Sequence, residues 1–368
     1  MEFRVSIQGL LVFLLLDGIL AMPAFAREDL VPGSRYTSAQ GAAMGDAALP
    51  MGDDVASGLF YNPADLGKIR KSGFEPINMS GYVNGPFIDT ATTNSYQVIS
   101  LPAFMPNLQR DPGQMVGVGG QFLPTFGFPN VGFGILGLSQ IAAQANSDGT
   151  VTYRSVYQII PAIGTGFKFF NGVVRVGYSL QWVNEAVGTQ TAQASTVAGY
   201  NQNLSQGSGF SNNFGLAITA PMKSLPSLNF VVRNAFNTYY DTSTIIFPFS
   251  SSTTGSPPPT DLMSFDGSFS LQPRLGRGAV LTLVVEDRDI TNTSGMAFLG
   301  HFAAGAEINL RNKIFLRGGW GSGYPSAGFG FRSSSSDISF AWYSEEIGTG
   351  YLSQRDIRYM MQYQIKAF

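Results

Sequence analysis

The feature that most constrains the fold of this chain is a two-residue alternation of apolar and polar side chains. From about Phe74 to Phe368, segments with apolar residues at alternate positions are separated by clusters of Gly, Asn, Ser and Pro. A period of two is typical of β-strands that bury one face. Residues 174–182 show it most clearly, with one face formed by Val174, Val176, Tyr178, Leu180 and Trp182 and the other by Arg175, Gly177, Ser179 and Gln181.

Turn signals divide this region into strands. The dipeptide Asn171-Gly172 favours a type I′ turn in a hairpin that runs over residues 156–183. The same alternation recurs in 214–220, 228–232, 314–320, 327–331, 338–342 and 357–367. At about 10 residues per strand, the pattern predicts about 14 strands. The longest loops are predicted at 184–210 and 241–262, and both are expected outside the cell because long barrel loops lie there.

Composition indicates a membrane protein. Charged residues make up 12% of the chain, about half of the roughly 25% that a soluble domain uses, yet mean hydropathy is near zero. A soluble sandwich can share the hairpin pattern but needs more surface charge. Beyond the first residues, no apolar run is long enough for a membrane-spanning helix. We therefore predict an all-β fold, a transmembrane antiparallel β-barrel of about 14 strands.

The N-terminus predicts export. Arg4 precedes the apolar run Leu10–Leu16, and Ala24-Phe25-Ala26 matches the small-x-small pattern of signal peptidase sites. We expect residues 1–26 to be a cleaved signal peptide that directs the chain to the outer membrane of a Gram-negative cell. A retained anchor is the alternative, but the run is far shorter than the roughly 20 residues of a span. The terminal Phe368 is similar to the aromatic last residue that barrel-assembly machinery recognises. It differs in phase, because the alternation places polar residues at this position.

Residues 27–72 lack the alternation and are predicted to form a separate N-terminal segment, followed by the barrel over 73–368. This segment is rich in Gly, Ala and Asp and contains Asn62-Pro63-Ala64. Proline fixes its own φ and pushes Asn62 towards an extended conformation, so a defined bend is expected. Asp53 and Asp54 either form a carboxylate site or, as acids in Gly-rich stretches more often do, cap a helix or pair with arginines.

Three short stretches of this segment resemble the start of the FadL-type outer-membrane transporter superfamily. They are 41–47 (GAAMGDA), 53–57 (DDVAS) and 61–64 (YNPA). Residues 275–368 look like the smaller PorV-type relatives. The resemblance implies a 14-stranded barrel closed by an N-terminal plug, or hatch, with Asn62, Pro63, Ala64, Asp53 and Asp54 in the plug motif. It also implies a lumen through which hydrophobic molecules pass and leave sideways. The chain has little room for the long extracellular insertions of the larger transporters, which puts fatty acid itself in doubt as the ligand.

Polar side chains on the inward parity are candidates for the lumen wall. They are Arg154, Arg175, Gln181, Arg233, Glu307, Arg317 and Arg358. A charge facing lipid at mid-membrane costs about 2–4 kcal/mol, so these side chains are expected to point inward. There they would pair with one another or with acids of the plug.

Other function classes find little support. A net charge of −2 gives no basic footprint for nucleic acid. The absence of Cys excludes disulfides and thiol chemistry. His301 is the only histidine and has no nucleophile motif beside it, which argues against an enzyme. We predict neither catalytic residues, metal site nor cofactor.

The resemblance therefore implies transport of small hydrophobic, fatty-acid-like compounds by facilitated diffusion through a plugged barrel. The alternative is a PorV-like role in assembly, secretion or surface attachment with a protein partner and without transport. A general porin fits less well, because a plug would block bulk water-soluble solutes. The expected partners are outer-membrane lipids, a hydrophobic ligand and the barrel-assembly machinery.

Overall fold

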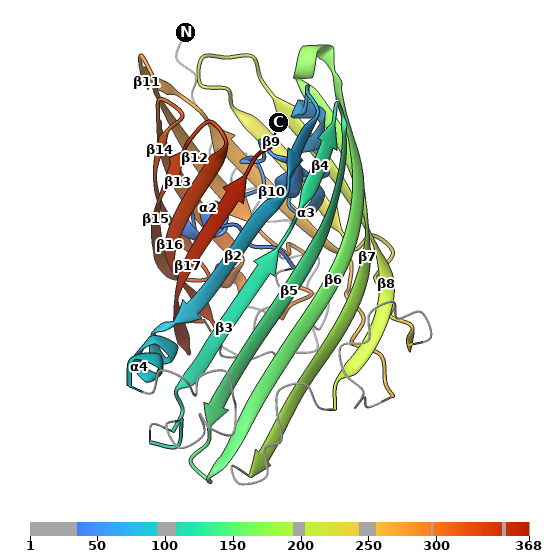
Figure 1. The fold of residues 1–368 in the computed structure, drawn as a ribbon. Helices are drawn as coiled ribbons and strands as arrows, with labels where there is room; N and C mark the ends of the chain where they lie inside the picture. Colours follow the sequence, from blue (N-terminus) through green and yellow to red (C-terminus); the bar gives the residue numbers. More distant parts are fainter. Residues whose placement is uncertain are drawn as a thin grey trace.

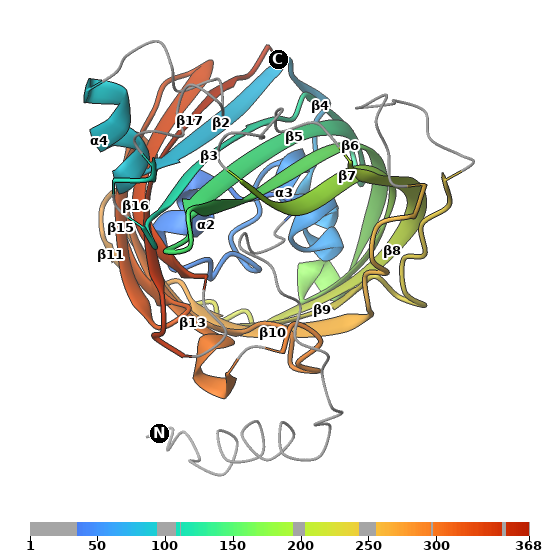
Figure 2. The ribbon, with the colours of Figure 1, turned by 90° about the horizontal axis from the view of Figure 1, so that it is seen from below.

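The structure is a computed structural model that describes residues 35–93, 108–110, 112–193, 203–242, 255–295, 297–347 and 351–367. The predicted signal peptide, residues 27–34 and Phe368 lie outside the described residues. Strands form a closed antiparallel barrel, seen from the side in Figure 1 and along its axis in Figure 2. Two short α-helices, α2 (Ala39–Ala43) and α3 (Val55–Phe60), lie inside the ring.

Three strands of the barrel are interrupted where a proline removes a backbone donor. Pro76 separates β1 (Gly73–Glu75) from β2 (Ile77–Asn84), Pro124 separates β3 (Met115–Phe122) from β4 (Thr125–Phe128), and Pro273 separates β10 (Ser264–Leu271) from β11 (Arg274–Gly276). Between β1 and β2 the register against the neighbouring strand shifts by one residue. This bulge turns Glu75 to the inside, where it lies beside Thr125.

The remaining strands are continuous. They are β5 (Val131–Ala145), β6 (Thr150–Phe169), β7 (Val174–Gln193), β8 (Ser205–Thr219), β9 (Ser227–Arg233), β12 (Ala279–Asp287), β13 (Phe302–Leu310), β14 (Ile314–Gly321), β15 (Tyr324–Arg332), β16 (Ser336–Glu346) and β17 (Arg355–Ile365). Each pairs with its neighbours in the chain, and β17 pairs with β2 to close the ring. With the interrupted strands counted once each, the described residues form the predicted 14-stranded antiparallel barrel.

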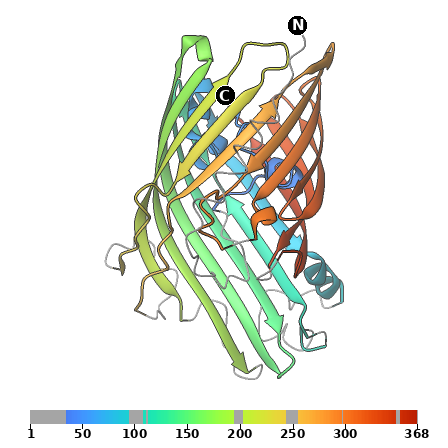
Figure 3. The ribbon, with the colours of Figure 1, turned by 180° about the vertical axis from the view of Figure 1, so that it is seen from behind.

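The two strands β6 and β7 are 20 residues long, twice the predicted length. The prediction of a loop over 184–210 is therefore wrong, because β7 continues to Gln193 and β8 begins at Ser205. Where β6 and β7 extend beyond the membrane, their outer faces are no longer in contact with lipid and need no alternating apolar residues. The hydrogen bonds between the two strands continue there. At the end of the barrel where β7 stops, the strands drawn in green extend well beyond the orange and red ones (Figures 1 and 3).

The turn between β6 and β7 also differs from the prediction. Phe169 pairs with Val174, so the loop has four residues rather than two. Positive φ angles occur at Phe170, Asn171 and Gly172 (51°, 57° and 90°). The Asn-Gly signal located the reversal but not its type, because Phe170 also adopts the left-handed conformation.

The two faces of the barrel wall have opposite character. On β5 and β6 the side chains of Phe133, Ile135, Ile163 and Phe167 are 40–52% exposed on the outside, whereas Leu136 and Ile160 are fully buried inside. An apolar outer belt is what a bilayer requires of a spanning barrel. In the described residues no helix is long and apolar enough to cross a membrane.

The two ends of the barrel differ in their connections. At one end, β6–β7, β8–β9, β13–β14 and β15–β16 are joined by short turns, and this end also carries the C-terminus (Figure 1). At the other end lie longer connections, including helix α4 (Gly85–Thr93) and the 3-10 turn η5 (Phe298–Gly300). Short turns and chain ends are periplasmic in outer-membrane barrels, so the longer connections mark the extracellular end.

Candidate functional site

Residues 35–72 form a compact lumenal segment. Each of its three helical turns begins with a side-chain cap: Ser38 accepts a hydrogen bond from Gly41 N at 2.9 Å, Asp54 from Ser57 N at 2.7 Å, and Asn62 from Ala64 N at 3.1 Å. Asn62 is extended (φ −139°, ψ 106°) and Pro63 opens the 3-10 helix η1 (Pro63–Lys68). Local capping and the proline therefore fix the bend at Asn62-Pro63-Ala64.

A row of glycines seats this bend against the barrel wall. Gly166, Gly177 and Gly215 are register partners on β6, β7 and β8, and all three face the lumen. A Cβ atom on Gly177 would lie 2.1 Å from the carbonyl carbon of Pro63, and one on Gly215 would lie 2.3 Å from the Asn62 Oδ1. The backbone of the bend thus rests directly on the backbone of three strands, which only glycine permits.

A second glycine row holds the other end of the segment. Gly305 and Gly319 are register partners on β13 and β14. A Cβ atom on Gly319 would lie 2.2 Å from the carbonyl carbon of Met44, and one on Gly305 would lie 2.7 Å from the Met44 carbonyl oxygen. The segment is therefore seated on two walls of the barrel, one on each side of α3.

Several predicted lumen residues bind the lumenal segment. Gln181 and Ser179 donate to the carbonyl oxygen of Leu59 at 2.9 and 3.1 Å, where α3 ends. Arg233 donates to the carbonyl oxygens of Phe60 and Tyr61 at 2.9 and 3.3 Å and pairs with Asp266. These donors satisfy carbonyl groups that the short helix leaves without partners.

The other predicted lumen residues are also turned inward. Arg175 lies 3.8 Å from Asp65 of η1. Glu307 accepts from Arg317 at 2.7 Å and from Gln40 of α2 at 2.9 Å. Arg358, in contrast, pairs with Glu345 and Asp356 on its own wall, each at 2.6 Å. Arg154 on β6 is buried as well.

The acids of the lumenal segment have separate structural partners. Asp54 is a helix cap, Asp53 is exposed and lies 3.3 Å from Arg332, and Asp46 lies 2.5 Å from Arg288. Asp65 is fully buried beside Lys68 at 2.8 Å. Burial raises the pKa of the Asp65 carboxyl above its ordinary value, and Lys68 and Arg175 offset part of that rise. The described residues hold no cluster of acids or histidines suited to a metal ion.

An apolar wall on the inner face of the barrel packs against the lumenal segment. It is formed by inward residues of β5, β6 and β7: Leu136, Leu138, Val156, Ile160 and Val183, all less than 9% exposed. These side chains form one cluster with the aromatic rings of Tyr36, Phe60 and Tyr61 from the lumenal segment. The lumenal segment therefore covers an apolar wall, which would be uncovered only if the segment moved.

His301 occupies a structural position. It is buried, and its Nδ1 lies 2.8 Å from the carbonyl oxygen of Arg288 in the connection that follows β12.

Replacing Arg233 with glutamine should loosen the lumenal segment. The change removes the donor to Phe60 and Tyr61 and leaves Asp266 without its cation inside the barrel. Because Asp266 is buried but Arg233 is partly exposed, losing these charge-assisted hydrogen bonds should cost about 1.5–3 kcal/mol. We expect a lower thermal unfolding temperature and faster hydrogen exchange in residues 35–72. Lys168→Gln, at an exposed position, is the control and should change neither; equal effects of both variants would refute the role of Arg233.

Comparison with solved structures supports this architecture. A deltaS2 mutant of TodX, described as a monoaromatic hydrocarbon channel, is 10% identical, with 91% of this chain and 99% of that chain covered and a TM-score of 0.50. The chain has the fold of the FadL-type channels. A Pseudomonas aeruginosa FadL homologue (11% identity, 90% and 97% covered, TM-score 0.45) and the Ralstonia pickettii toluene transporter TbuX (12%, 91% and 99%, 0.36) also match. No protein-family model and no curated protein matches the sequence.

The alternation pattern did not predict the two glycine rows of this FadL-type fold. The inward parity of Gly177 was visible beside Arg175 and Gln181, but its alignment with Gly166 and Gly215 depends on strand register. A signal was present nonetheless, because glycines weaken strands and tend to mark close backbone approaches.

Proposed function

We propose that this protein lets small hydrophobic compounds cross the outer membrane by facilitated diffusion through the barrel, with residues 35–72 as the plug. The observation that carries the proposal is the apolar wall of Leu136, Leu138, Val156, Ile160 and Val183, which meets the plug. Apolar lining is typical of sites for hydrophobic ligands. The fold shared with TodX, a monoaromatic hydrocarbon channel, supports the same class of solute.

In this mechanism a compound enters from the extracellular end, reaches Phe60 and Tyr61, and meets the apolar wall once the plug moves away from it. Passage then requires a shift of the plug near Asn62-Pro63-Ala64. The plug is bound in part by hydrogen bonds to its backbone, such as those from Gln181 and Arg233. Such bonds can be exchanged for water when the segment moves.

Native mass spectrometry of the barrel extracted from outer membranes in mild detergent tests the proposal. We expect a retained hydrophobic small molecule, which is lost when Ile160 is replaced by asparagine. An empty lumen together with a stoichiometric co-purifying protein would overturn the transport proposal in favour of an assembly or attachment role.

A further inference from the structure

The two ends of the barrel differ in charge. The periplasmic end carries a basic rim of exposed side chains: Arg70, Lys71, Lys168, Lys223, Arg274, Arg277, Arg311 and Lys313. In the part of the chain that the structure describes, Asp53 is the exposed acid at this end. The extracellular end instead exposes Asp89, Asp148 and Asp241 together with Arg110 and Arg355. The strong excess of cations is thus confined to the periplasmic rim.

The basic rim borders the apolar outer belt. Lys168 lies between Phe167 and Phe169, which are 51% and 50% exposed, and Leu275, 58% exposed, lies between Arg274 and Arg277. Apolar side chains that face lipid and adjacent cations mark the level of the lipid headgroups. Lys168 pairs with Arg175 and so lies on the inner parity, which leaves the turn residues Lys223, Arg277, Arg311 and Lys313 as the cations best placed to meet lipid phosphate.

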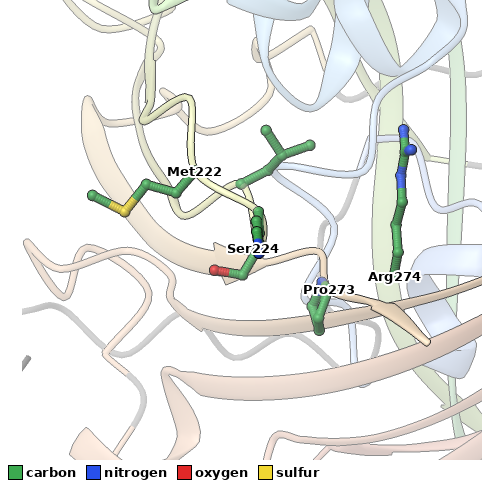
Figure 4. Close-up of a pocket in the computed structure, with 6 residues that line it drawn as sticks. Met222, Ser224, Pro273 and Arg274 are labelled. Atoms are coloured by element: carbon green, nitrogen blue, oxygen red, sulfur yellow. The ribbon is translucent and has the colours of Figure 1, made fainter. Parts of the chain in front are cut away.

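A pocket of about 510 Å³ interrupts this rim between the β8–β9 turn and the start of β11. Figure 4 shows the labelled lining residues Met222, Ser224, Pro273 and Arg274, with the Met222 side chain directed away from Arg274, and Lys223 and Leu225 complete the lining. Gln272 N donates to the Ser224 carbonyl oxygen at 2.6 Å, which ties the turn to the strand. The pocket combines two cations with three apolar side chains, which suits an anionic amphiphile.

We propose that the basic rim binds the phosphate groups of anionic phospholipids in the periplasmic leaflet, and that the pocket of Lys223 and Arg274 seats one such lipid. Each cation near an anionic membrane surface adds to the attraction, and the effect weakens with salt. An acidic protein would not require the exposed Phe167, Phe169 and Leu275 beside the cations, whereas acyl chains do. The site is separate from the lumen and independent of the proposed transport.

Native mass spectrometry with two lipids of identical acyl chains tests this site. The full-length barrel is mixed with equal amounts of phosphatidylglycerol and phosphatidylcholine. We expect preferential retention of phosphatidylglycerol by the native protein. In the variant Lys223→Gln/Arg274→Gln/Arg277→Gln/Arg311→Gln, retention should fall about tenfold.

The double variant Arg110→Gln/Arg355→Gln, at the extracellular end, is the matched control and should retain the native preference. Because the rim variant has to form a barrel, its strand content is checked by circular dichroism. The native protein offers a second reading, since salt raised to about 0.5 M should abolish its preference. Equal retention of both lipids by the native protein would overturn the proposal. So would unchanged retention by the rim variant with loss of a co-purified acidic protein.

Discussion

Alanine in place of Gly177 is expected to unseat the plug while leaving the barrel closed. The new Cβ atom would lie 2.1 Å from the carbonyl carbon of Pro63, well inside the 3.0 Å below which real Cβ atoms essentially never approach. Both partners are backbone, so neither can rotate away. We expect hydrogen exchange across residues 35–72 to rise by about tenfold or more. The conductance of the barrel in planar bilayers should rise with it.

Gly319→Ala and Gly318→Ala form a matched pair on β14 for the same claim. At Gly319 the Cβ atom would lie 2.2 Å from the carbonyl carbon of Met44, whereas at Gly318 the nearest atom is 3.9 Å away. Only the first variant should release the plug. If both adjacent variants behave alike, the glycine row does not seat the segment.

Asparagine at Leu136 and Ile160 should reduce uptake of hydrophobic compounds more than any change elsewhere on the wall. These two residues are register partners on β5 and β6 and are fully buried on the inner face. Burial of one such aliphatic side chain contributes about 1.5–3 kcal/mol, so losing apolar contact with the solute should lower the initial uptake rate about tenfold. Uptake is measured with a radiolabelled monoaromatic compound in cells that produce each variant.

Leu136→Met and Ile160→Leu are the corresponding controls, because they keep an apolar side chain of similar volume. They should retain most of the native rate. Loss of uptake in the controls would mean that shape at the wall, rather than apolar character, determines passage.

The barrel could be predicted from the sequence because its strongest constraint, the alternation of Val174 to Trp182 and its repeats, is local. Lipid demands apolar side chains outside, and Arg175, Gln181 and Arg233 identify the opposite face through the cost of charge in the bilayer. The strand count followed from these repeats. The predictions that failed concern residues outside the bilayer, where lipid does not require alternating apolar side chains.

Residues 184–193 illustrate this failure. They continue β7 with Glu185, Gly188 and Gln190, a composition that looks like a loop because the strand has left the apolar belt. The glycine rows could not be predicted for another reason. Their function depends on which glycines lie opposite one another, and for Gly166 and Gly177 that register depends on the four-residue loop at 170–173.

The most direct measurement is flux through the purified barrel reconstituted into liposomes, comparing a monoaromatic hydrocarbon with a sugar of similar size. For the native barrel the account predicts faster entry of the hydrocarbon than into empty liposomes and no entry of the sugar, whereas Gly177→Ala should admit the sugar. Entry of the sugar through the native barrel would contradict a plugged lumen. Hydrocarbon flux no faster than in empty liposomes would contradict hydrophobic transport itself.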